Sequence, residues 1–523
     1  MAEASILYRI TVFLAALVPA VFLIGFVGFV LYLFYQHKRF AHFPGPPRSD
    51  FFTGHVRQMI DRINTGSSLA EYLTDQMRVY GQVYHLFMFH KPVVVVLEPN
   101  FLKEVMHSTT HTKPPEEAST FWYVFGQRFL YHGLLTETDI PKYLKRRALF
   151  SPAFHRSYLM NLMGSFNEST DILINKLAEK ADGKTTVYML DELNQVTLDV
   201  IAKVAFGLHL NKTADSGFSF TTAVKTSLEG VMATFLQPWI KYSFLPSHRQ
   251  FRQKVRDSIH HLRETGRKCV QGRLEAKKRG EKLPNDILTY ILDASNDLQA
   301  DADFRMEEML DEFVTFFLAG QEETTNLMAF MLHELGHHPE IMHRVVTEVN
   351  AVLGDRDYVE YADLAKFEYL SQVIKETLRL WPPAFGTNRL MASDVTVQGL
   401  KIPAGTVVWL NTYVMGRMES HFKNPLVFDP DRFHKSGSED RPLYAYFPFS
   451  MGTRSCLGQP FALIEARLIV ARLLHKFEFK LCPGQPRGDI VQHASLQLRD
   501  RCMNYLHLSN IRIFPACYYV CWT

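Results

Sequence analysis

The fold of this chain is restricted most by a loop of ten residues around one cysteine, at positions 449–458. Phe449 stands seven positions before Cys456, and Arg454 stands two before it. A thiolate so placed can be the axial ligand of a haem iron, onto which it pushes electron density. Gly452 and Gly458 would let the backbone approach a porphyrin closely and adopt conformations closed to other residues, while Arg454 would pair with a propionate. The loop therefore predicts Cys456 as an iron ligand.

This loop resembles the cysteine loop of the cytochrome P450 superfamily at every diagnostic position. The resemblance implies the P450 fold, a thiolate-ligated haem b (iron protoporphyrin IX) and a monooxygenase reaction. It also makes Phe449, Arg454, Cys456 and Gly458 haem-binding residues. The alternative is a structural cysteine buried on a turn, which is the usual state of a single free cysteine. That alternative does not account for the aromatic residue, the arginine and both glycines in register.

An uncharged, apolar run occupies residues 10–35. It is long enough to cross a bilayer core of about 30 Å, and it is too long for the apolar region of a signal peptide. Lys38 and Arg39 follow the run, which predicts a cytoplasmic location for the bulk of the chain. We expect an uncleaved single-pass anchor at residues 1–36 and a basic, proline-rich hinge at 37–50. The resemblance to microsomal family members places the protein in the endoplasmic reticulum membrane.

The rest of the chain is expected to form one catalytic domain, residues 51–498, followed by an atypical tail, 499–523. Strands are predicted at residues 83–89, 93–97 and 406–410, and long amphipathic helices at 159–181, 191–207 and 251–279. Helices with minor sheet indicate an α+β, mainly helical fold with small peripheral sheets. The six cysteines show no disulfide pattern, and the net charge of +3 gives no reason to expect nucleic-acid binding.

Other motifs match the haem scaffold of the family. Glu376 and Arg379 share one helical face, and the resemblance implies that they join Arg432 in a buried network that locks the cysteine loop. Arg147, Arg389 and Arg454 are the expected propionate ligands. The family carries tryptophan where this chain has Tyr143, and a phenol can still donate a hydrogen bond there.

The stretch 311–325 is predicted to be the helix above the iron, where family members carry Ala-Gly-x-Glu-Thr. In the family the glutamate feeds protons and the threonine stabilises bound dioxygen. Here Glu322 takes the glutamate position, Glu323 the threonine position, and Thr324 comes one residue later. Glu323 could relay protons itself, a local register shift could present Thr324, or oxygen activation could be impaired. The catalytic candidates are therefore Glu322, Glu323 and Thr324.

Several further stretches resemble the cholesterol 24-hydroxylases, a sterol side-chain hydroxylating branch: residues 313–317, 369–373, 382–387, 412–418 and 446–450. The anchor and the tail do not match this branch, and the tail shows little strand pattern where family members carry a hairpin that lines the substrate pocket. Fatty-acid hydroxylation is the nearest alternative.

The resemblance also implies partners: dioxygen, an apolar lipid or sterol, and the flavoprotein NADPH–cytochrome P450 reductase. Lys145 and Arg146 are candidates for the surface that receives the reductase. Glu323 leaves open a haem-thiolate isomerase or a peroxide-using enzyme. A non-catalytic, sterol-binding membrane protein with a degenerate site is the remaining alternative.

Overall fold

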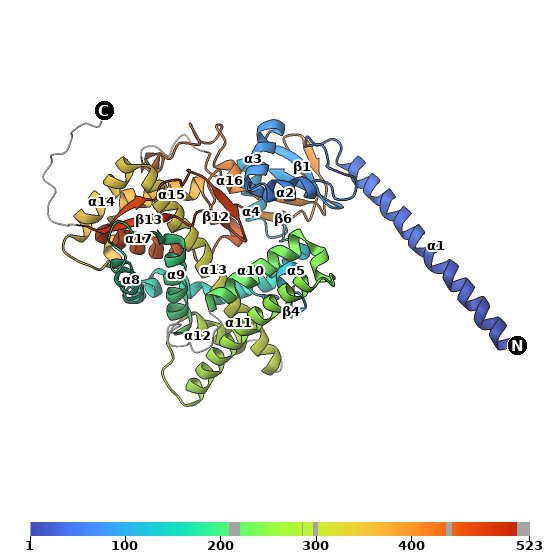
Figure 1. Cartoon of the computed structure of the whole chain (residues 1–523), viewed down its shortest axis with the longest axis horizontal. Coiled ribbons are helices and arrows are strands. Elements are labelled where there is room, and N and C mark those ends of the chain that lie inside the picture. The colour runs from blue at the N-terminus through green and yellow to red at the C-terminus, as the bar shows by residue number, and fades with distance from the viewer. Residues whose placement is uncertain (1, 209–219, 285, 297–301, 436–441, 510–523) are drawn as a thin grey trace.

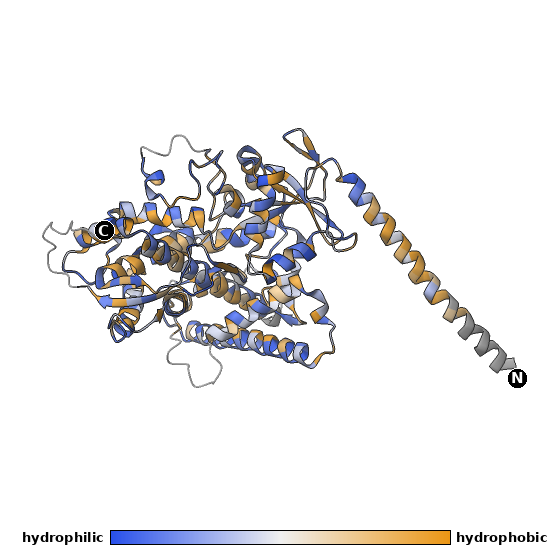
Figure 2. Ribbon diagram, turned by 45° about the horizontal axis from the view of Figure 1, so that its top comes forward, coloured by the Kyte–Doolittle hydropathy of each residue, from blue (hydrophilic) through white to orange (hydrophobic). Residues whose placement is uncertain are grey.

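The computed structural model describes residues 2–208, 220–284, 286–296, 302–435 and 442–509. A single long helix, α1 (Ala2–Arg39), projects from a mainly helical body (Figure 1). Its residues are apolar along most of this projection (Figure 2). Within the described residues one helical stretch is long and apolar enough to cross a membrane, Leu17–Arg39. The expected apolar helix is therefore present as a candidate membrane anchor, and the helix continues to Arg39, past residue 36.

The proline-rich segment after α1 is fixed to the domain. Phe40 and Phe43 are buried, the Pro44 carbonyl accepts a hydrogen bond from the His85 backbone N–H at 2.9 Å, and the His55 ring lies 2.9 Å from the Pro46 carbonyl oxygen. The predicted proline-rich hinge is therefore held to the domain at Phe40, Phe43 and Pro46, while most of its other residues are exposed.

The largest sheet has four strands in the order β1-β2-β9-β6. These are β1 (Val83–Met88), β2 (Lys91–Val96), β9 (Val407–Asn411) and β6 (Gly386–Leu390). The valine run of β2 is buried, as predicted, because it pairs with β1 on one side and lies parallel to β9 on the other. Two-stranded sheets are formed by β3 (Tyr123–Val124) with β4 (Gln127–Arg128), and by β7 (Val395–Val397) with β8 (Leu400–Ile402).

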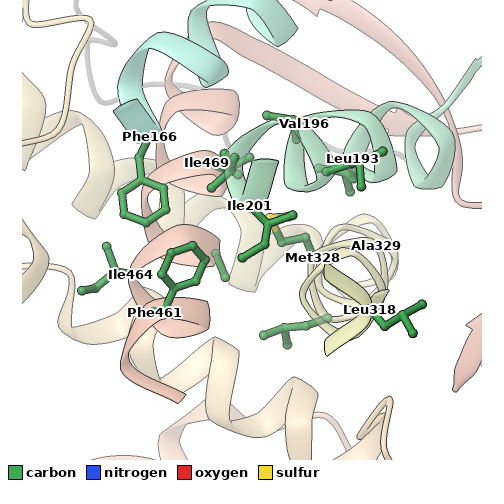
Figure 3. Packing of buried hydrophobic residues seen from close by; sticks show 14 of the residues in the cluster. Phe166, Leu193, Val196, Ile201, Leu318, Met328, Ala329, Phe461, Ile464 and Ile469 are labelled. Carbon is green, nitrogen blue, oxygen red and sulfur yellow. The ribbon is translucent and has the colours of Figure 1, made fainter. Parts of the chain in front are cut away.

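The core is built around α13 (Ala302–His337), which runs through the domain (Figure 1). Helices α9 (Met189–Phe206) and α17 (Gln459–Lys476) pack against it, and the close view shows Ile201 of α9 beside Met328 of α13 (Figure 3). A Cβ on Gly320 would lie 2.7 Å from Cδ1 of Ile201, which explains why α13 has glycine in mid-helix. The predicted distal helix is therefore the middle of α13.

The other helices surround this core. They are α2 (Val56–Asn64), α3 (Leu69–Tyr80), α4 (Pro99–His107), α5 (Pro115–Trp122), α6 (Ile140–Phe150), α7 (Arg156–Asn161), α8 (Met163–Ala178), α10 (Phe220–Leu236), α11 (Pro246–Lys278), α12 (Ile287–Asn296), α14 (Pro339–Leu353), α15 (Glu368–Leu380) and α16 (Thr412–Met415). The predicted helix at 159–181 is divided into α7 and α8, whereas those at 191–207 and 251–279 correspond to α9 and α11.

The expectation for the tail is wrong in its described part. Strand β13 (Met503–Leu508) pairs with β10 (Phe477–Leu481) and β5 (Val187–Tyr188), so the domain continues past residue 498. A hairpin of β11 (Ile490–Gln492) and β12 (Leu496–Leu498) lies just before it. The hairpin is thus present, only earlier in the sequence than we expected. Residues 510–523 of the predicted tail lie outside the described residues.

Candidate active site

Cys456 lies two residues before the N-cap of α17. Its backbone N–H donates to the Phe449 carbonyl at 2.8 Å, which closes the loop. Burial raises the pKa of the Cys456 thiol, whereas hydrogen bonds from the backbone N–H groups of Gly458 and Gln459 act in the opposite direction. The side chain is nevertheless accessible to solvent, so the thiol faces a concave surface with dense protein around it. Donors at a helix N-terminus suit a sulfur that carries negative charge.

Helix α6 holds the cysteine loop directly. Arg147 donates to the Ser455 carbonyl at 2.6 Å and to its hydroxyl at 3.1 Å, and the Tyr143 hydroxyl donates to the Thr453 carbonyl at 3.2 Å. The guanidinium carbon of Arg454 stacks 3.5 Å from the centre of the Tyr143 ring. Tyr143 and Arg147 thus bind the loop itself, a role that we did not predict for them.

The two loop glycines differ. Gly452 has φ of +68°, and a Cβ there would lie 2.6 Å from the carbonyl carbon of Met106 in α4, so the loop is seated against a helix end. Gly458 has φ of −79°, which any residue can adopt. The conformational part of the expectation is therefore wrong for Gly458. A Cβ there would meet only the Cys456 sulfur, at 3.9 Å, and a Phe154 ring atom, at 4.0 Å.

The predicted network of Glu376, Arg379 and Arg432 is present and buried. Arg379 forms a bidentate pair with Glu376, with both distances at 2.7 Å, and the Arg432 Nε lies 3.3 Å from the same carboxylate. Among the described contacts these residues hold the segment 416–433 and not the cysteine loop itself. The connection to the loop is indirect: the Tyr446 hydroxyl donates to the Lys375 carbonyl, and its ring packs on Phe433.

Two predicted propionate ligands carry buried N–H groups that have no partner among the residues described by the structure. These are Nη2 of Arg389 and Nη1 of Arg454. Burial, and then the charge of Arg454, lower the pKa of Arg389 to about 10. Lys113 belongs to the same cluster, since burial and the charges of Arg454 and Arg389 lower its pKa to about 7. Unsatisfied buried cations are costly, and the two carboxylates of a haem beside the Cys456 thiol would satisfy them. The residues present fit haem.

The opposite wall of the site is α13. Ala319 and Glu323, four residues apart on one helical face, are exposed although the helix is otherwise buried here. Although the Glu323 side chain is accessible, dense protein surrounds it, as at Cys456. This burial, and then the neighbouring Glu322, raise the pKa of Glu323 to about 8, and Glu323 in turn contributes to the raised pKa of Cys456. The two side chains therefore face the same space. Glu323 occupies the position that the threonine has in the family motif.

The neighbours of Glu323 point elsewhere. Thr324 is 4% exposed, and α13 is an unbroken α-helix here, so the register shift that would present Thr324 is absent. Glu322 accepts a hydrogen bond of 2.5 Å from the hydroxyl of Ser495, in the turn between β11 and β12. Asn326 donates to the same hydroxyl at 2.8 Å.

A family model for cytochrome P450 matches residues 44–501 of the chain. The chain belongs to the cytochrome P450 family. As a P450 it is a monooxygenase that binds haem through a cysteine thiolate, which removes the non-catalytic alternative.

Similar P450s cover between 77% and 94% of this chain. Cytochrome P450 4B1 of Homo sapiens is 30% identical over 492 residues, 90% of each chain. Cytochrome P450 4d2 of Drosophila melanogaster is 28% identical over 509 residues, 94% of this chain and 98% of the relative. Cytochrome P450 3A6 of Oryctolagus cuniculus is 27% identical over 411 residues, 77% of this chain and 80% of the relative. None of the three supports the finer resemblance to cholesterol 24-hydroxylases.

One candidate for the reductase surface of this P450 is turned inward. Arg146 donates to Glu312 at 2.9 Å and to Glu308 at 3.0 Å, both on α13. Its charge is therefore engaged within the domain, and that part of the expectation is wrong. Lys145 is on the exposed side of α6.

Sequence reasoning missed Lys113 and Ser495. Lys113 lies in the sequence His-Thr-Lys-Pro, which matches no haem-binding motif. It reaches the site because it directly precedes α5, whose first turn is hydrogen-bonded to β6. Ser495 lies 173 residues from its partner Glu322. No signal in a single sequence identifies either of them.

Proposed function

We propose that this P450 hydroxylates an apolar lipid with dioxygen and electrons from NADPH–cytochrome P450 reductase, and that Glu323 moves protons in place of the usual threonine. The overall reaction converts R–H, O₂, NADPH and H⁺ to R–OH, H₂O and NADP⁺. Cys456 would hold the iron, and Arg389, Arg454 and Lys113 would hold the propionates. The bound haem supplies the thiolate-ligated iron at which dioxygen is reduced.

The observation that carries this proposal is the orientation of Glu323 toward the side of the site that holds Cys456. Because burial raises its pKa, the carboxyl group keeps its proton at neutral pH and can donate it. Glu322 is positioned by Ser495, and its pKa is raised as well, chiefly by burial. Two adjacent carboxyl groups with raised pKa values can pass a proton from the β11–β12 hairpin toward the site.

A sterol side chain is the first substrate candidate, and a fatty acid is the alternative. The resemblance of five stretches to sterol side-chain hydroxylases supports the first. The anchor does not match that branch, but the hairpin that the tail lacks is supplied by β11–β12, whose turn contacts α13 through Ser495.

The test uses the full chain, loaded with haem and reconstituted with reductase in lipid nanodiscs. Cholesterol and a long-chain fatty acid are offered separately with NADPH, and products are identified by mass spectrometry. Side-chain hydroxysterol is expected. Turnover of the fatty acid alone would refute the sterol assignment, and turnover of neither would refute the proposal. Glu323→Gln is expected to lower product per NADPH consumed, while Glu340→Gln, an exposed position on α14, is the matched control.

A peroxide-using enzyme is a second candidate, because a carboxyl group facing the iron side can move a proton between the two oxygens of a hydroperoxide. In that reaction R–H and H₂O₂ give R–OH and H₂O, with no reductase. The same preparation, supplied with hydrogen peroxide in place of NADPH and reductase, distinguishes the peroxide-using enzyme from the reductase-dependent monooxygenase. Product from hydrogen peroxide that depends on Glu323, with none from NADPH, would favour this candidate.

We further infer that the protein is anchored in the endoplasmic reticulum membrane with its domain in the cytoplasm. The basic end of α1 and the apolar span support this orientation. Exposed aromatic residues between α10 and α11 support contact with the lipid surface: Trp239, Tyr242 and Phe244, the last 84% exposed. This junction lies on the side of the domain from which α1 projects (Figure 1). Protection of the domain from protease added to intact microsomes would contradict the orientation.

A further inference from the structure

A pocket of about 570 Å³ opens on the surface near α3 and α16, away from Cys456 and Glu323. Its floor includes Arg417, and its outer wall is the segment 424–427. Helix α3 contributes Met77 and Arg78 to the rim. None of these residues is among the haem ligands or catalytic candidates named above, although Arg379 and Arg432 bind the backbone of the segment 424–427.

Arg417 is a buried cation without a carboxylate partner. It is 9% exposed, and among the described residues no carboxylate lies within salt-bridge distance of it. Its guanidinium carbon lies 3.4 Å from the centre of the Tyr413 ring and 4.7 Å from that of Trp381. One Nη donates to the Tyr413 carbonyl at 3.3 Å. Burial lowers the pKa of Arg417 to about 10, so it remains charged at neutral pH.

The wall of the pocket is held from behind by three other arginines. Arg379 donates to the carbonyls of residues 425 and 427, Arg432 to that of residue 424, and Arg487 to that of residue 426. Every carbonyl of this segment is therefore bound on its inner side. As a result the apolar side chains of Leu426 and Val427, 54% and 53% exposed, are directed outward at the pocket.

We propose that this pocket binds a small organic anion with an apolar body, such as a medium-chain carboxylate. Arg417 would take the carboxylate, and Met77, Leu426 and Val427 would contact the apolar part. A charged guanidinium with free N–H groups binds carboxylate strongly, and the aromatic rings on its other faces leave the pocket side for a ligand. The rim residues Arg78 and Glu419 carry opposite charges, which offset each other. The positive charge of Arg417 therefore makes an anion the preferred ligand.

The test measures binding of 11-(dansylamino)undecanoate to the haem-loaded full chain, with the haem pocket filled by a saturating azole. Its fluorescence reports transfer into an apolar site, and its methyl ester is the uncharged control probe. A saturable site is expected that prefers the acid to the ester by about tenfold or more, as for a hydrogen bond to a charged group. Equal binding of acid and ester would overturn the proposal.

Two variants locate the site. Leu426→Glu places a negative charge at the exposed wall and is expected to weaken acid binding by about tenfold or more, and Arg417→Met should do the same. Val79→Glu adds the same charge to a neighbouring apolar residue, 71% exposed and not part of the pocket, and should leave binding unchanged. Since Leu426 is on the surface, its variant tests the proposal even if Arg417→Met fails to fold. Unchanged binding by Leu426→Glu would refute the assignment.

Discussion

Replacing Gly452 with alanine tests how the cysteine loop is positioned. At φ of +68° an alanine costs about 1–2 kcal/mol for the left-handed conformation alone. The new Cβ would also lie 2.6 Å from the Met106 carbonyl carbon, below the 3.0 Å that real Cβ atoms keep. Met106 is fully buried, so α4 cannot yield and the loop has to move. We expect a total cost of about 3–5 kcal/mol, comparable to a poorly tolerated core substitution.

The matched control is Gly405→Ala. Gly405 has φ of +78° but nothing within 4 Å of an added Cβ, so it isolates the conformational cost. Unfolding of both variants is followed by circular dichroism, and the reduced, CO-bound absorption spectrum reports the thiolate. Gly452→Ala should be the less stable variant and should lose the red-shifted CO band, whereas Gly405→Ala should keep it. Equal stabilities together with an intact band in both would refute the contact with α4 as the cause.

Three further predictions follow from buried charges. Arg379→Met should cost about 3–5 kcal/mol, because it leaves Glu376 buried and unpaired, while Arg344→Met, in an exposed pair, should cost at most about 1 kcal/mol in the same denaturation assay. Glu465 is buried with no hydrogen-bond partner in the described part of the chain, and burial raises its pKa, so native stability should fall as pH rises above about 4.5, where the unfolded chain ionises. Glu465→Leu should flatten that slope and add about 1–3 kcal/mol near neutral pH; a slope like that of the parent would contradict this. For Glu323, product per NADPH should decline as pH rises through about 8, because the proton donor is lost. Glu323→Gln should show no such decline, and an identical pH profile in the variant would exclude Glu323 as the donor.

Much of the fold was predictable because its elements have local signatures. The valine run of β2 identified a buried strand, and α15 ends at Leu380, just before Trp381 and two prolines that cannot continue a helix. The tail was misjudged because β13 is specified by its partners β10 and β5 and not by a pattern of its own. Pairing across more than 300 residues leaves little trace in a single sequence.

The residues of the candidate site also fall into two groups: those that a local motif identifies and those that only the tertiary fold brings to the site. Cys456, Arg389 and Arg454 belong to compact motifs, and the structure brings them together with Glu323. A helix turns by about 100° per residue, so the unbroken α13 directs Glu323 and Thr324 to different sides, and Thr324 is buried. Lys113 was missed because it joins the cluster only through the docking of α5, and Arg146 was assigned outward because its partners lie on α13.

The attachment of α1 has a consequence for how this enzyme meets other molecules. The last turns of the helix are buried against the domain at Leu33 and Gln36, and the ring of Phe26 stacks on that of Phe52 at 6.2 Å. Phe40, Phe43 and Pro46 in the segment that follows are buried as well, so α1 is held to the domain at several points. If α1 spans the bilayer as proposed, the tilt of the domain follows the tilt of this one helix. Electron donors diffusing in the same membrane would meet the enzyme at a constant height and angle.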